Sequence, residues 1–230
     1  SLHYLFIAKR KFEYYKDEEF YYYFWAMIIF SILFFINIVN FSDYKINLTS
    51  VRHSIFTTVS LLTTSGFTIT DYENWPTFSN MLVFILLFLG GSSGSTTGGM
   101  KIIRTIVISR YLFCEIRRLL HPKGIFNISI NKKVIDDDVI KSTLGFYLFY
   151  IFIFILSALI LSTTGLDFIT SLTAAASAIG NIGPGLGSIG PSGNWGHLTD
   201  MAKWVTSFCM LLGRLEIFTI MVLFSRSFWK

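Results

Sequence analysis

The chain has 230 residues, of which 53% are hydrophobic, 17% are aromatic and 14% are charged. Charged residues make up roughly 25% of soluble domains, so this composition excludes a soluble domain and indicates an integral membrane protein. The formal net charge of +5 is explained by how the basic residues are distributed around a membrane, and no nucleic-acid partner is needed to account for it.

The first element is a short apolar stretch after Ser1 that runs into basic residues. We expect residues 1–19 to be the end of a preceding helix and a cytoplasmic linker, so that the chain is the C-terminal part of a longer protein. The uncharged stretch 20–42 follows, and it is long enough to cross a bilayer, which takes about 20 apolar residues.

A shorter apolar run, 51–63, comes next and ends at a glycine-centred turn formed by Thr64, Ser65, Gly66, Phe67 and Thr68. A helix of this run is about 18 Å long at 1.5 Å per residue, too short to cross a bilayer. The sequence therefore predicts a half-crossing helix followed by a turn and an extended return.

The span 78–114 is interrupted by ten consecutive glycine, serine and threonine residues at 90–99. Such a stretch destabilises a helix. One interpretation is a flexible gate loop, with Gly90, Gly91, Gly94, Ser95, Gly98 and Gly99 as its candidate residues. The alternative is a small-residue interface for close helix packing, but that would repeat small residues every fourth position, whereas here they are unbroken. We favour the gate.

After a basic linker, 115–140, the same order recurs. An apolar span, 142–166, precedes a short run, 168–179, and a second turn formed by Asn181, Ile182, Gly183, Pro184 and Gly185. A last span, 202–228, carries Arg214 within the membrane region. An intramembrane arginine is costly, so we expect Arg214 to contact the 90–99 loop. It is either a structural contact to carbonyls of the loop or a positive barrier beneath an ion filter formed by the two turns.

Two landmarks define an internal repeat. Gly66 and Gly183 lie 117 positions apart, and Asn74-Trp75 and Asn194-Trp195 lie 120 apart. We therefore predict an all-α membrane protein with two helix–pore-loop–helix repeats, 20–114 and 141–230, that line a pore.

Basic residues predict the orientation. Most of the 19 Lys and Arg residues fall within 9–16, 101–141 and 226–230, and basic residues near the ends of spans are retained on the cytoplasmic side. Both termini of the chain and the 101–141 connection are therefore expected to be cytoplasmic, which makes the repeats parallel.

The half-crossing helices predict a cation site. Each directs the negative end of its dipole toward the bilayer centre, and backbone carbonyls of the turn that follows can replace the hydration shell of an ion. Gly66, Gly183 and Gly185 permit the required backbone conformations. We expect the ten residues of the two turns to bind a cation, and no organic cofactor to be bound.

Several motifs together resemble the TrkH-type subunit of bacterial Trk/Ktr potassium uptake systems, in the superfamily that includes the HKT transporters. These are 63–68 with Thr70-Asp71-Tyr72, the 90–101 stretch, 181–187, and 213–219 with the ending 228–230. The resemblance runs nearly end to end. Gly180 departs from it, because the family pattern has a second asparagine before Asn181.

The resemblance implies that one chain carries four repeats around a central pathway, in a fourfold pore like that of a potassium channel, and that this chain holds the last two, which form half of that pore. The transported ion that the ten residues of the two turns bind is then expected to be K⁺. It also implies a missing N-terminal half, a homodimer, and a TrkA-like cytoplasmic nucleotide-binding regulatory subunit, for which the basic 117–133 loop is a docking face. The location implied is the bacterial inner membrane.

Other functions fit less well. The 185–190 stretch has dinucleotide-binding spacing but follows no strand, and 91–94 is similar to a serine protease motif but has no histidine inside a span to act as base. We expect no catalysis. A broken-helix secondary transporter is the main alternative, and a purely structural membrane subunit leaves the turns and Arg214 unexplained.

Overall fold

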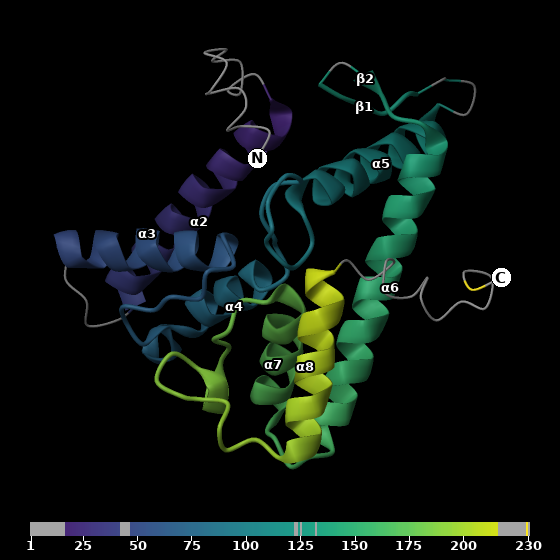
Figure 1. Cartoon of the computed structure of the whole chain (residues 1–230). Helices are drawn as coiled ribbons and strands as arrows, with labels where there is room; N and C mark the ends of the chain where they lie inside the picture. The colour runs from purple at the N-terminus through teal and green to yellow at the C-terminus, as the bar shows by residue number, and fades with distance from the viewer. Residues whose placement is uncertain are drawn as a thin grey trace, which may run out of the picture.

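The computed structural model describes residues 17–41, 47–121, 124, 126–131, 133–215 and 229. Within these residues the protein is largely helical (Figure 1). The helices are α2 (Glu18–Phe41), α3 (Leu48–Leu62), α4 (Thr77–Leu86), α5 (Ile102–Leu120), α6 (Asp137–Ser162), α7 (Phe168–Gly180) and α8 (Asp200–Arg214). Smaller elements are the 3₁₀ turns η2 (Tyr72–Asn74) and η3 (Gly187–Ile189) and the antiparallel hairpin of β1 (Ser129–Ile130) and β2 (Lys133–Val134).

The helices form two groups with the same order of elements. Helix α2 packs against α3 and α4, and α6 packs against α7 and α8. Helix α5 joins the groups, because it contacts both α2 and α6. Figure 1 shows the short helices α3 and α7 pointing their C-terminal ends toward the middle of the molecule.

The long helices α2 and α6 are, within the described residues, the two that are long and apolar enough to cross a membrane. With 24 and 26 residues, they are about 36 and 39 Å long at 1.5 Å per residue. Helix α6 ends at Ser162, earlier than the predicted residue 166, because Gly165 takes a φ of 87° that a right-handed helix cannot contain.

The interrupted span is broken more widely than predicted. Helix α4 ends at Leu86 and α5 starts at Ile102, so the break takes in apolar residues on both sides of 90–99. Helix α5 then continues to Leu120, inside the predicted linker 115–140. Of the predicted last span, the structure describes α8 up to Arg214, and 216–228 lie outside the described residues.

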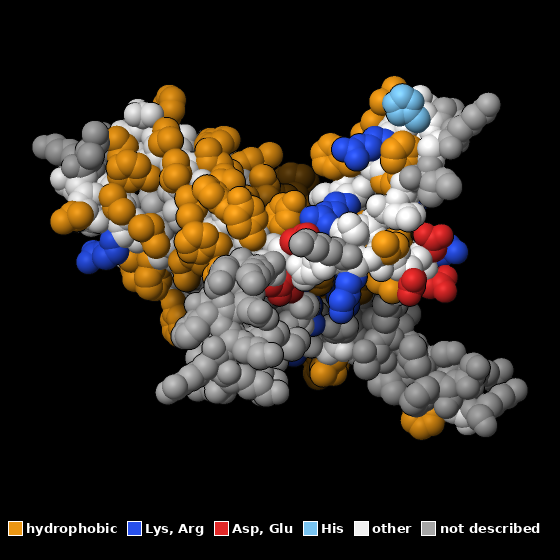
Figure 2. Space-filling view, turned by 90° about the horizontal axis from the view of Figure 1, so that it is seen from above, with side chains coloured by type: hydrophobic (Ala, Val, Ile, Leu, Met, Phe, Trp, Pro, Cys, Tyr) orange, Lys and Arg blue, Asp and Glu red, His pale blue; other side chains and the backbone are white. Residues whose placement is uncertain are grey.

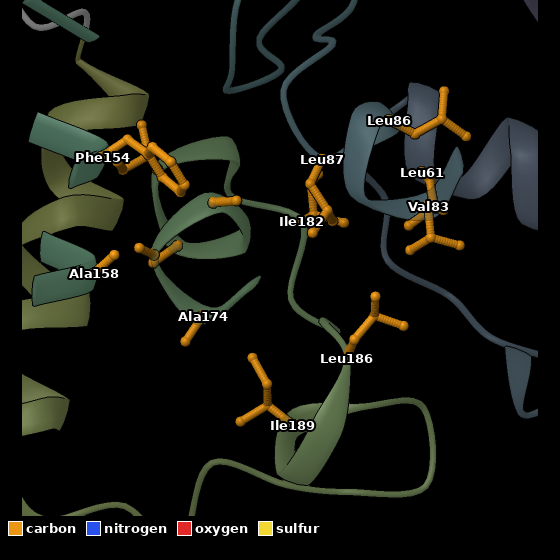
Figure 3. Close-up of a cluster of buried hydrophobic side chains, with 14 of the residues drawn as sticks. Leu61, Val83, Leu86, Leu87, Phe154, Ala158, Ala174, Ile182, Leu186 and Ile189 are labelled. Carbon is orange, nitrogen blue, oxygen red and sulfur yellow. The ribbon is translucent and has the colours of Figure 1, made fainter. Parts of the chain in front are cut away.

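One hydrophobic core connects the two groups (Figure 3). Helices of both groups and the chain after α7 contribute side chains to it, including Leu61, Val83, Leu86, Leu87, Phe154, Ala158, Ala174, Ile182, Leu186 and Ile189. In a bilayer the lipid tails are as apolar as leucine, so this core stabilises the fold through close packing more than through removal of water.

Large apolar side chains also remain on the outside of both long helices. Ile29, Ile32 and Ile36 of α2 and Phe152, Ile155 and Leu159 of α6 are about half exposed or more, as expected for helices in contact with lipid. Figure 2 views the end of the molecule that carries α5 and the hairpin, and it shows hydrophobic side chains over much of the α2–α4 group and charged side chains near the middle and over α5 and α6.

Candidate ion-binding turns and the α4–α5 loop

The turns that follow the two short helices have a left-handed backbone at the same two positions. Thr64 and Asn181, which lie 117 positions apart, adopt φ of 52° and 53°. Gly66 and Gly183, also 117 apart, adopt φ of 70° and 111°. A left-handed φ is unusual for threonine, so its occurrence at the position that matches Asn181 indicates that the turn geometry, more than the residue type, is repeated.

A serine one turn before each helix end holds the turn in place. The Ser60 carbonyl accepts a hydrogen bond from the Ser65 amide at 3.0 Å, and the Ser177 carbonyl accepts one from the Ile182 amide at 3.1 Å. The Ser177 hydroxyl also accepts a bond from the Gly183 amide at 3.1 Å. These amides of the turns are thereby satisfied by groups of the preceding helix. The carbonyls of the turns are not used in these bonds.

The first turn (residues 64–68) and the second turn (residues 181–185) are in direct contact. A β-carbon built on Gly66 would lie 1.9 Å from the Ile182 carbonyl oxygen and 2.9 Å from Cδ of Pro184. No side chain fits in this space. The glycine is therefore required both for its positive φ and for the close approach of the second turn.

Hydrogen bonding divides the carbonyls of the two turns into two sets. Three accept bonds from side chains: Phe67 from Ser60 Oγ at 2.6 Å, Gly183 from Trp195 Nε1 at 3.0 Å, and Gly185 from the Tyr72 hydroxyl at 3.2 Å. Among the hydrogen bonds within the described part of the chain, the other carbonyls of the turns accept none; these belong to Thr64, Ser65, Gly66, Thr68, Asn181, Ile182 and Pro184.

The tryptophan landmarks of the repeat have different surroundings. Trp195 reaches back to the second turn through its bond to Gly183. Trp75 is buried in the core, where its ring packs edge-on against Phe34 at 5.5 Å between centroids, and its Nε1 has no partner among the described residues. The sequence offset between these residues is therefore not matched by a common contact.

The α4–α5 loop (residues 87–101) is closed at its neck. The Gly90 amide donates to the Met100 carbonyl at 2.8 Å, and the Met100 amide donates to the Phe88 carbonyl at 3.0 Å. Inside the neck, the Gly91 amide donates to the Thr97 hydroxyl at 3.0 Å. A β-carbon at Gly90 would lie 2.4 Å from the Gly98 carbonyl oxygen, so the two strands of the neck can approach this closely only without a side chain there.

The same loop packs directly against the end of α7. A β-carbon on Gly98 would lie 2.4 Å from the Gly180 carbonyl oxygen and 3.0 Å from Cβ of Asn181. On the α8 side, a β-carbon on Gly213 would lie 1.8 Å from the Ile179 carbonyl oxygen. Close backbone packing thus brings the predicted gate residue Gly98 next to the second turn.

Arg214 contacts the loop as the sequence predicted. Its guanidinium donates a hydrogen bond to the Thr96 carbonyl. A cavity of about 370 Å³ lies between the loop, α5, α6 and the end of α8, and Thr96, Gly99, Tyr150 and Arg214 are among the residues that line it. The predicted gate residues Ser95 and Gly99 line the same cavity.

Sequence reasoning missed one residue at this site, Glu19 in the first turn of α2. Its side chain is buried and accepts hydrogen bonds from the amide and the hydroxyl of Ser93 in the loop. The partners lie 74 positions apart, so the sequence gives no sign of the pairing, beyond the presence of an acidic residue at the very start of an apolar span.

Half-length helices whose terminal turns meet, next to a broken helix whose loop packs against them, keep irregular backbone buried inside the protein, as expected of a helical membrane protein. The TrkH family model, described as a cation transport protein, matches residues 20–230, and the chain belongs to this family.

Relatives with assigned names agree with this. The chain is 38% identical over 233 residues to the Trk system potassium uptake protein TrkH of Halomonas elongata, an alignment that covers 100% of the chain and 47% of that protein. It is 43% identical over 183 residues to TrkI of the same organism, covering 79% of the chain and 37% of that protein.

Among solved structures, the crystal structure of the potassium transporter TrkH from Vibrio parahaemolyticus is similar with a TM-score of 0.90 and 34% identity. The match covers 100% of this chain and 49% of that one. The chain thus spans about half the length of the relatives it matches.

Proposed function

We propose that this chain forms part of the pore of a potassium uptake system of the Trk type, in which carbonyls of the two turns coordinate K⁺. The observation that carries the proposal is the contact of Gly66 with the Ile182 carbonyl, which brings together two turns that share left-handed residues at matching positions. Carbonyls on both turns that have no hydrogen-bond partner among the described residues supply uncharged oxygen ligands, the kind that replaces water around an alkali ion.

The charge distribution around the turns supports a cation. Helices α3 and α7 both end at the turns, and the C-terminal end of a helix carries a partial negative charge equivalent to about half an elementary charge. Neither turn contains an acidic or basic residue, so the dipoles and carbonyls set the local field. This arrangement favours a weakly held, mobile monovalent ion over a tightly bound divalent one.

The α4–α5 loop acts as the gate in this proposal. It packs against the second turn through Gly98 and is held from the α8 side by Arg214. A loop whose neck is closed by backbone bonds can move as a unit about that neck, while its glycines supply the conformational freedom. Gly90 and Gly98 also allow close backbone packing, which is what the alternative interpretation, a small-residue interface, predicted. Such packing is compatible with a gate.

The remaining parts of the system are also proposals. Two further repeats of a longer polypeptide complete the fourfold filter, the protein forms a homodimer in the bacterial inner membrane, and both ends of this chain are cytoplasmic. A TrkA-like nucleotide-binding regulatory subunit docks on the basic 117–133 segment. The repeat boundaries at 114 and 141 stay a prediction, as does the absence of catalysis.

Ion flux in proteoliposomes containing the complete protein tests the proposal. We expect uptake of a rubidium tracer that K⁺ inhibits and Na⁺ inhibits less, and that Gly66→Ser alters. Uptake that requires a co-transported solute and is unaffected by Gly66→Ser would favour a broken-helix secondary transporter. Absence of ion flux from well-folded protein would contradict the proposal.

A further inference from the structure

Glu19 holds the α4–α5 loop from the side opposite Arg214. Its side chain is 5% exposed. One carboxylate oxygen accepts the Ser93 amide at 2.5 Å, and the other accepts the Ser93 hydroxyl at 2.7 Å. Bonds of this length to an ionised acceptor are about twice as strong as bonds between neutral groups. Glu19 therefore binds Ser93 through two strong hydrogen bonds.

The surroundings of Glu19 suit a buried carboxylate. It lies in the first turn of α2, where the positive end of the helix dipole stabilises negative charge. Its own amide donates to Oδ1 of Asp17 at 3.0 Å, so the start of the helix is capped independently of the loop. The carboxylate can only accept hydrogen bonds, and its two donors among the described residues come from the loop.

The first turn of α2 is itself fixed to other elements. The carboxylate of Glu18 pairs with Nη2 of Arg110 on α5 at 2.6 Å, and the Glu18 amide donates to Oδ1 of Asn131 in the hairpin at 2.9 Å. The pair is partly exposed and contributes little to stability. Its effect here is geometric, because it holds the adjacent Glu19 at a constant position beside the loop.

The two contacts act on neighbouring parts of the loop from different repeats. Ser93, bound by α2, and Thr96, bound by Arg214 at the end of α8, are three positions apart. Figure 1 shows the loop in the middle of the molecule, between α2 and the end of α8. A loop tied on both sides cannot leave its place until at least one tie breaks.

We propose that Glu19 is a positioning residue that holds the α4–α5 loop in its closed place, and that release of Ser93 from Glu19 is a step in opening. This inference rests on the proposed function, since it assigns a mechanism to the proposed gate. We call these two contacts latches, because each holds the loop in place. Arg214 donates a hydrogen bond to the loop, and Glu19 accepts hydrogen bonds from it.

Hydrogen exchange of the loop amides tests the latch without measuring transport. In the complete protein in detergent, we expect Glu19→Ala to speed exchange across residues 88–100 about ten-fold or more, because two bonds to a charged group are lost. Glu19→Gln keeps a neutral acceptor and gives a smaller increase. Ser93→Ala, which loses the hydroxyl bond alone, gives an increase below that of Glu19→Ala and serves if that variant fails to fold.

The matched control is Glu115→Gln, which removes a partly exposed carboxylate that pairs with Arg118 at 2.6 Å on α5. It leaves loop exchange unchanged. If the Glu19 and Ser93 variants exchange at the control's rate, the latch is overturned.

Ion flux in proteoliposomes then separates the latch from the proposed function. We expect basal K⁺ flux to rise in Glu19→Ala and to stay at the wild-type value in Glu115→Gln. Faster loop exchange in Glu19→Ala, together with no K⁺ flux through either the variant or the wild-type protein, would support the latch and contradict the proposed function. Wild-type basal flux in Glu19→Ala despite faster loop exchange would refute release of Ser93 as an opening step.

Discussion

Replacing Gly66 by serine places a β-carbon where the second turn already lies. The β-carbon would be 1.9 Å from the Ile182 carbonyl oxygen, whereas ordinary contacts start near 3.4 Å, so one turn must move by about 1.5 Å, the difference between these distances. The φ of 70° adds strain, since a left-handed conformation costs a residue with a side chain about 1–2 kcal/mol.

A shift of this size is large for carbonyls that replace the hydration shell of an ion. We expect Gly66→Ser to reduce the ratio of K⁺ to Na⁺ uptake by about ten-fold, which corresponds to about 1.4 kcal/mol of lost discrimination. The assay is tracer uptake into proteoliposomes containing the complete protein, with thermal unfolding of the same preparation in detergent.

Gly165→Ser is the matched control. Gly165 has a comparable φ of 87°, but a β-carbon there meets nothing within 4 Å. It therefore carries the backbone strain without the displacement of a turn, and we expect it to lower stability while leaving the uptake ratio unchanged. If Gly66→Ser changes the ratio no more than Gly165→Ser does, Gly66 lies outside the filter and the reasoning is refuted.

Three further substitutions test the loop, the second turn and the start of α7. Gly98→Ala puts a β-carbon 2.4 Å from the carbonyl oxygen at the end of α7, and we expect basal K⁺ flux to rise; unchanged basal flux would argue against the gate. Trp195→Phe removes the donor to the Gly183 carbonyl, which should lower the free energy of unfolding by about 1 kcal/mol and weaken K⁺ uptake at low K⁺; wild-type uptake would show that this carbonyl's orientation does not matter. Hydrogen bonds from a side chain and from amides at the start of α7 lower the pKa of Asp167. Asp167→Ala should lower the free energy of unfolding by about 0.5–2 kcal/mol at neutral pH. The difference from the wild-type protein should disappear as pH falls through that lowered pKa.

The sign of the last effect follows from linkage. A carboxyl group whose pKa is lower in the folded state contributes its full stabilisation above its unfolded pKa and loses it below the folded one. Melting temperatures of wild-type and Asp167→Ala protein measured across the acidic range therefore should converge at low pH. A constant difference at all pH values would show that the carboxylate charge is not what caps α7.

The sequence predicted those parts of the structure that local patterns encode. The long helices follow from uninterrupted apolar runs, the short ones from runs too brief to cross, and the broken helix from the unbroken glycine, serine and threonine residues at 90–99. The contact of Arg214 with that loop was predicted from the cost of an unpaired charge in a membrane and is confirmed.

Features that depend on the approach of distant segments could not be predicted. The bonds of Glu19 to Ser93 join helix and loop across 74 positions. The left-handed φ of Thr64 is set by the turn and not by the residue. The sequence relates Trp75 to Trp195 by their offset alone, and it does not show that one is buried in the core while the other bonds to the second turn.

Which carbonyls of the turns remain open is also a tertiary property. All ten residues of the turns were predicted from the sequence to bind the ion. In the structure, three of their carbonyls accept hydrogen bonds from side chains outside the turns. The donor Tyr72 comes from the other repeat, 113 positions away from its acceptor. The candidate ligands for K⁺ are thereby reduced to the carbonyls that accept no hydrogen bond from the described part of the chain.

The most direct measurement is the anomalous scattering of thallium, a K⁺ substitute, in crystals of the complete protein grown or soaked with Tl⁺. The account predicts a peak between the turns, within coordination distance of carbonyls near Gly66 and Ile182, which excess K⁺ abolishes. Ordered turns with no peak between them, or a peak at a different part of the chain, would contradict it.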